Sequence, residues 1–171
     1  MEWMPFELRP EPHPTLRPEG EYLQRAWSQS VYPLARRMGV PIALPQVSPQ
    51  PHSHLAFEGF QYAKEHGKAN EYNHRVLEVF FREGRDIGDI GVLTALAGEV
   101  GLDQPEFQES LRSRKYRAAH LSALRHAYQE VGVEGVPLFV IGDRMLSGVQ
   151  DRETLESVID EELAKSGHGS S

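Results

Sequence analysis

The chain has 171 residues, of which 39% are hydrophobic and 25% charged, and its formal net charge is −7. This length is sufficient for one domain with a substantial core, and the composition is typical of a globular chain. The acidic balance argues against nucleic acid as a partner. Because the chain has no cysteine, disulfides, cysteine metal sites and thiol nucleophiles are excluded from these residues.

Two further features bear on location and partners. The densest basic group lies in a helical pattern and is interpreted as a solvated helix face; it comprises Arg112, Arg114, Lys115 and Arg117. No apolar stretch approaches the length of a membrane span, and residues 1–5 do not resemble a signal peptide. We therefore expect a cytoplasmic protein with neither a membrane nor a nucleic-acid partner.

The first 51 residues combine a short strand pattern with a helix between proline-rich segments. Residues 2–8 alternate between two faces and predict a β-strand, in which Pro5 marks an edge position. Residues 9–18 and 40–51 each contain four prolines and predict an extended connector and an irregular loop. Residues 19–38 carry apolar side chains at helical spacing, and Pro33 predicts a kink or helix junction near Tyr32.

The middle of the chain predicts a series of helices. Ser53, Asp89 and Asp103 are candidate N-caps, and Pro105 and Glu106 strengthen the third start signal. Glycines at 67, 84 and 101 mark helix ends. With two further helices expected between 104 and 131, the helical block spans about residues 19–131.

A strand–strand–helix unit is predicted over residues 136–165. The run Leu138–Ile141 has no polar side chain, as in a strand covered on both faces. A Gly-Asp turn leads to a second strand over 145–149, and Asp151 caps a helix. We expect a single domain over 1–165 and a mobile tail over 166–171.

Several residues that could carry chemistry have simpler structural explanations. The histidines form no helical i,i+4 ligand pair and no HExxH pattern, so surface or capping roles are favoured. No nucleophile is paired with the carboxylates of Glu7, Asp86 and Asp89, and a helix cap already explains Asp89. Ser147 lacks the GxSxG context, and no glycine-rich phosphate loop is present. We expect neither a metal nor a cofactor.

Pro137 lies at the mouth of the first predicted strand of that unit and has two interpretations. It can be a trans proline that opens a strand, where the missing N–H is tolerated. It can instead follow a cis peptide bond after Val136, which would fix a backbone edge for an extended substrate. Only about one X–Pro bond in twenty is cis in folded proteins, so the pattern alone favours trans.

The motifs taken together resemble a known family. Gly135-Val136-Pro137, the run 139–141 and residues 146–150 are similar to the C-terminal half of a DsbA-family thioredoxin fold, more narrowly its FrnE-type branch. Residues 3–10 resemble the branch's strand after the active-site helix, and residues 83–103 resemble its helical insertion. The resemblance implies an α/β fold, a truncated thioredoxin-like sheet with a large helical insertion.

The resemblance also implies a binding site without its catalytic half. In that family the residue matching Pro137 is a cis-proline that faces a dithiol, so Gly135, Val136 and Pro137 are expected to bind a thiol or an extended peptide. The family's Cys-x-x-Cys lies at a helix N-terminus, which favours the thiolate. This sequence resembles the family only from the following strand onward, so we expect no catalytic residue in it.

The strand that the resemblance implies to be missing would lie between the strands at 2–8 and 138–141. Its absence would expose two ladder edges. The true protein could be longer, the first strand could close directly on the strand at Leu138, or two copies could assemble. Of these we favour a homodimer for the chain as given.

Three functions follow, and whether the chain is an enzyme is left open. The first is a thiol–disulfide oxidoreductase of the DsbA/FrnE type, inactive in exchange as given because it has no cysteine. The second is a glutathione-dependent isomerase similar to 2-hydroxychromene-2-carboxylate isomerases, a related family in which a serine replaces the first cysteine. The third is a non-catalytic module that binds extended chains or assembles with itself.

Overall fold

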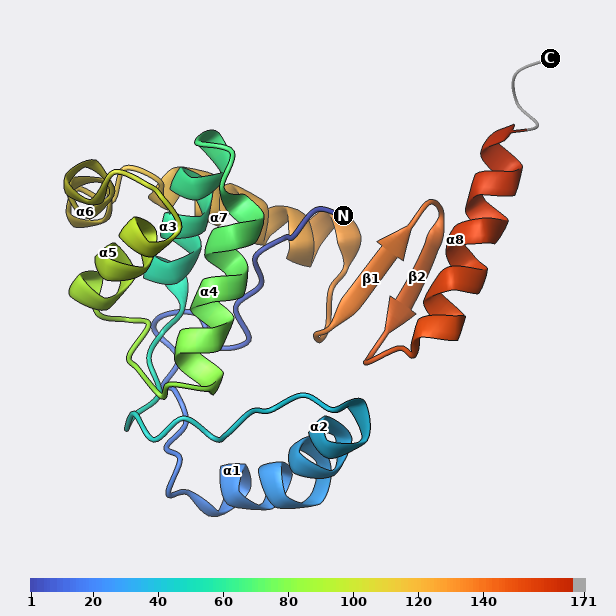
Figure 1. Ribbon diagram of the computed structural model, residues 1–171, viewed down its shortest axis with the longest axis horizontal. Helices are drawn as coiled ribbons and strands as arrows, with labels where there is room; N and C mark the ends of the chain where they lie inside the picture. Colours follow the sequence, from blue (N-terminus) through green and yellow to red (C-terminus); the bar gives the residue numbers. More distant parts are fainter. Residues whose placement is uncertain (168–171) are drawn as a thin grey trace. The chain divides into compact units, whose positions relative to one another are not determined.

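The structure, a computed structural model, describes residues 1–167 and consists of two compact units (Figure 1). The first unit comprises Met1–Leu124 and the second begins at Arg125. Helices dominate, and the sheet formed by the described residues has two strands. Within residues 1–167 no helix has the length and apolar character needed to cross a membrane. The single domain over 1–165 stays a prediction.

The helix expected to break near Tyr32 contains a widened turn. It consists of α1 (Glu21–Ala26), the π-helical segment η1 (Trp27–Val31) and α2 (Tyr32–Met38). Proline lacks an N–H and its ring crowds the carbonyl of the preceding turn. A π-turn directly before Pro33 is a common way to absorb that crowding. The predicted junction is therefore confirmed.

Five helices form the main body of the first unit: α3 (His54–Glu65), α4 (Ala69–Phe81), α5 (Ile90–Glu99), α6 (Gln104–Arg112) and α7 (Arg117–Arg125). The predicted caps of α5 and α6 are confirmed, because Asp89 accepts from the Val92 N–H and Asp103 from the Glu106 N–H, both at 2.8 Å. The prediction that Ser53 caps α3 is wrong. Its side chain makes no capping bond, and its backbone is helical where a capping residue is usually extended.

Aromatic rings fill the centre of this unit. Tyr62, Tyr72 and Phe107 are fully buried, with the Phe107 ring edge-on to Tyr62 at 5.2 Å between centroids. Gly59 of α3 makes this packing possible, since a Cβ there would lie 2.7 Å from the Phe107 ring. A smaller cluster forms around Trp27, whose ring centroid lies 6.1 Å from that of Phe81.

The prediction of a strand at residues 2–8 is wrong. The segment is irregular, because an extended segment becomes a strand only when a partner supplies ladder hydrogen bonds, and within residues 1–167 only β1 and β2 pair. Its alternation still has a physical basis. Pro5 and Glu7 are buried, whereas Met4 and Leu8 are exposed. Trp3 packs on the helical core, with its ring 6.0 Å from His74.

The second unit is a hairpin with a helix along it (Figure 1). It contains η2 (His126–Val131), β1 (Leu138–Ile141), β2 (Arg144–Ser147) and α8 (Arg152–Gly167), and α8 contacts β1. The strands are antiparallel, with Leu138 opposite Ser147 and Val140 opposite Met145. β2 ends two residues before the predicted strand because Gly148, at φ 81°, turns the chain. Asp151 caps α8 through the Thr154 N–H.

Of the predicted tail over 166–171, residues 166 and 167 belong to α8. The last four residues of the chain lie outside the described residues.

Candidate functional site

The loop 132–137, between η2 and β1, is the centre of the candidate site. η2 ends at Gly132, whose φ of 71° is in the left-handed region that glycine adopts readily. The Val133 N–H donates to the Ala127 carbonyl at 2.9 Å and closes the helix end. The chain then reaches Pro137 through a cis peptide bond after Val136. This is the isomer that the family resemblance implies for that position.

A hydrogen bond joins the end of the loop to the residue at which the chain leaves the hairpin. The Gly148 N–H donates to the Pro137 carbonyl at 2.9 Å, directly beyond the Leu138–Ser147 pair. The Gln150 side-chain amide donates to the Ser147 carbonyl at 2.8 Å and holds the chain as it leaves β2. The entry and the exit of the hairpin are therefore fixed side by side.

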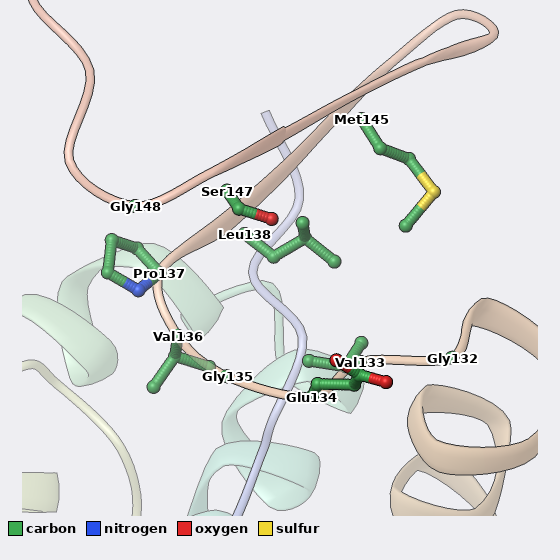
Figure 2. A pocket seen from close by; sticks show the side chains of 10 residues that line it. All are labelled: Gly132, Val133, Glu134, Gly135, Val136, Pro137, Leu138, Met145, Ser147 and Gly148. Atoms are coloured by element: carbon green, nitrogen blue, oxygen red, sulfur yellow. The ribbon is translucent and has the colours of Figure 1, made fainter.

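A hollow of about 400 Å³ opens at this place (Figure 2). Leu138, Met145 and Ser147 share one face of the hairpin, because side chains alternate along a strand and the register pairs residues 138 and 147. The loop and Gly148 supply the rest of the wall. The complete lining is Gly132, Val133, Glu134, Gly135, Val136, Pro137, Leu138, Met145, Ser147 and Gly148.

The main chain beside this hollow is free to pair with a ligand. Val136 is 48% exposed, and within residues 1–167 its backbone N–H and C=O have no hydrogen-bond partner. Gly135 is equally open, since a Cβ built there would meet no atom within 4 Å. A free N–H and a free C=O on one residue are what an added extended chain requires.

The lining offers little covalent chemistry. Its only hydroxyl belongs to Ser147 and its only carboxylate to Glu134, and the chain has no thiol. Residues 1–167 contain no group of three or more His, Cys, Asp or Glu side chains that could hold a metal ion. The arrangement is suited to binding and positioning a ligand.

The other candidate carboxylates lie in the first unit. Asp89 caps α5 as predicted, and Asp86 accepts from the Gly88 N–H at 2.8 Å in a local turn. Glu7 differs from both. It is 3% exposed, and its Oε1 lies 2.5 Å from Nε2 of His120, which is itself 1% exposed and stacked on Phe57.

His120 corrects the prediction that the histidines occupy surface or capping positions. Its Nε2 faces the Glu7 carboxylate, and its Nδ1 has no partner among residues 1–167. The tautomer protonated on Nε2 fits best, because it donates to Glu7 and leaves no buried N–H unpaired. Sequence separation conceals this pair, since its members are 113 positions apart in the chain.

Arg114 is also not part of a solvated face. Its guanidinium donates to both carboxylate oxygens of Glu58, at 2.7–3.1 Å, and the Glu58 side chain is 1% exposed. Arg114 adopts a φ of 55°, which is uncommon for a residue with a Cβ. These hydrogen bonds and the charge of Glu58 raise the pKa of Arg114.

His54 lies near the same charges. Burial lowers the pKa of His54, and the positive charge of Arg114 lowers it further, against weaker opposing effects of Glu11, Glu7 and Glu58. The His54 imidazole therefore stays neutral at a lower pH than an exposed histidine would. His54 on α3 therefore senses charges from the N-terminal segment and from Arg114, which lie far from it in the sequence.

The fold and the loop before β1 define a thioredoxin-like protein, and comparison with known families specifies which kind. The family model of the DSBA-like thioredoxin domain matches residues 1–160. The chain belongs to this family, and it is a member without cysteine in the sequence given.

One curated relative matches most of the chain. The chain is 47% identical to the uncharacterized protein YwbO of Bacillus subtilis (strain 168). The alignment spans 166 residues and covers 96% of this chain and 83% of YwbO.

Two solved structures share the fold. A 2-hydroxychromene-2-carboxylate isomerase matches with a TM-score of 0.71 and 22% identity, over 88% of this chain and 72% of that one. A proposed protein disulfide isomerase from Nitrosomonas europaea matches with a TM-score of 0.71 and 15% identity, over 92% and 79%.

Proposed function

We propose that the chain binds extended polypeptide segments at Gly135, Val136 and Pro137, as the substrate-binding part of a DsbA-like thiol–disulfide oxidoreductase. The unpaired main chain of exposed Val136, beside an open hollow, carries this proposal. An incoming strand would donate to the Val136 carbonyl and accept from its N–H. Since each such bond contributes about 0.5–1.5 kcal/mol net, short peptides should bind weakly.

These 171 residues supply no thiol for disulfide exchange. Disulfide exchange needs a thiolate that attacks a disulfide sulfur, and no residue of this sequence carries a thiol. The part that we assign to this chain is to hold a thiol- or disulfide-bearing segment in an extended conformation. A dithiol would have to be brought to that segment from elsewhere.

Peptide titration by NMR tests the binding role. An unstructured peptide should shift the amide signals of residues 135–138 before those of the helical unit. N-methylation of the peptide amide that donates to Val136 should abolish the shift, whereas N-methylation of the next amide should not, because alternate amides point away from the partner. Equal losses from both methylations, or shifts confined to residues 1–124, would contradict backbone pairing at this edge.

A glutathione-dependent isomerase is the alternative. The similarity to the isomerase structure does not favour it, because the proposed disulfide isomerase has the same TM-score. The two functions differ in ligand size. If S-hexylglutathione shifts residues 132–138 at concentrations where a peptide does not, the isomerase is the better assignment; the reverse result supports peptide binding.

We further propose that two copies associate. Among residues 1–167, β1 pairs only with β2, so its outer edge and that of β2 are available to another strand. Light scattering coupled to size exclusion should give twice the mass of one chain at micromolar concentration. A monomeric mass across that range would exclude the homodimer.

A further inference from the structure

We propose that Glu134 makes the edge at Val136 selective for extended segments that carry a lysine or arginine next to the paired residue. The inference rests on the proposed peptide-binding function and adds the charge of the ligand to it. It starts from the position of Glu134 on the same loop, two residues before Val136 (Figure 2).

Glu134 is the one charged residue in the lining of the hollow. The remaining lining side chains are apolar or absent, apart from the Ser147 hydroxyl. A carboxylate at the rim of such a surface has no competing positive charge in the lining. A cationic side chain of a bound segment would therefore meet attraction, and an anionic one repulsion.

The carboxylate of Glu134 is also available. It is exposed and forms no hydrogen bond or ion pair within residues 1–167. Two other acidic residues of this unit are engaged: Glu130 lies 2.6 Å from His126, and Glu161 lies 2.9 Å from Arg144. The loop therefore presents an unused anionic group where the backbone is unpaired.

The wider charge of the unit acts in the same direction. Between residues 125 and 167 the sequence has nine acidic and four basic residues, a larger imbalance than in the rest of the chain. Such an excess raises the local concentration of cations, and salt weakens the effect over about 8 Å at physiological ionic strength. The hollow is thus set in a negative environment.

The test uses three capped peptides that differ at one position, with Lys, Gln or Glu next to the residue that pairs with Val136. Amide shifts of residues 132–138 give the affinities. For the intact chain we expect the order Lys, Gln, Glu, with about two- to fivefold between neighbours, the range that exposed ion pairs give. The differences should shrink in high salt.

Three variants locate the effect. E134Q should bring the three peptides to similar affinities, and E134K should reverse their order. D160N is the matched control, because Asp160 is exposed on α8, outside the lining and without a side-chain partner in the described chain, and it should preserve the order. Since neither Glu134 nor Asp160 has a side-chain hydrogen bond or ion pair to lose within residues 1–167, all three variants should fold normally.

The outcomes separate the two proposals. If the peptides bind at residues 135–138 with equal affinity, or if E134Q leaves the order unchanged, the charge selectivity is refuted and the binding edge stands. If none of the peptides shifts these residues, both proposals are refuted.

Discussion

Loss of the Arg114 side chain should destabilise the protein by leaving a buried carboxylate without its partner. Glu58 is 1% exposed at its side chain and receives three hydrogen-bond contacts from the guanidinium. Breaking a buried ion pair at one end typically costs about 3–5 kcal/mol. Because the Arg114 side chain is 38% exposed, solvent screens part of the interaction. We therefore expect R114A to lower the free energy of unfolding by about 2–3 kcal/mol.

Urea denaturation followed by circular dichroism measures this loss. R117A serves as the matched control, since Arg117 is an exposed arginine close in sequence and makes no ion pair in the described chain; its effect should stay within about 0.5 kcal/mol. The double variant E58Q/R114A should regain about 1–2 kcal/mol over R114A, because it removes the uncompensated charge.

A third variant separates the ion pair from the backbone. Arg114 adopts a φ of 55°, where glycine is favoured over alanine by about 1 kcal/mol. R114G should therefore be more stable than R114A by that amount, although both lack the guanidinium. An R114A variant within about 0.5 kcal/mol of the unmodified chain, or no relief from E58Q, would refute the view of Glu58 as a dependent buried charge.

Three other predictions concern acid stability, packing and activity. The pKa of His54 in the folded chain lies below its unfolded value near 6.5, so the free energy of unfolding should fall as the pH drops through 6.5 toward the folded pKa. H54Q should flatten this part of the curve of stability against pH. A curve identical to that of the unmodified chain would contradict this prediction. G59A should cost about 1–3 kcal/mol in urea unfolding, because its Cβ would crowd Phe107 and Tyr72, whereas G135A, with open space, should stay near zero. The polypeptide should neither reduce insulin nor oxidise reduced RNase, and turnover above the blank would show that another group replaces the thiol.

Local signals in the sequence were sufficient for much of the fold. Asp89 and Asp103 cap their helices because capping depends on a side chain and a backbone N–H three residues away. Pro33 disrupts its helix because it lacks an N–H of its own. The strand at Leu138–Ile141 and the helix after Asp151 follow from the same short-range chemistry.

The candidate site was predicted in part. Residues 135–137 were identified through a family resemblance, since a proline before an apolar run does not by itself indicate a cis bond. The hollow, the free main chain of Val136 and the isolated carboxylate of Glu134 required coordinates. They depend on which groups the fold leaves without partners, and a sequence does not state that.

Long-range pairing is what the tertiary structure alone decided. The alternation at residues 2–8 predicts a strand, but strand formation depends on a partner, and the segment instead buries Glu7 against His120. The basic residues near 114 suggest a solvated face, yet Arg114 pairs with a carboxylate 56 residues away. Helix spacing and capping are set within a few residues, so composition and order determine them. Burial and charge pairing are set by which distant segments meet, and only the folded chain specifies that.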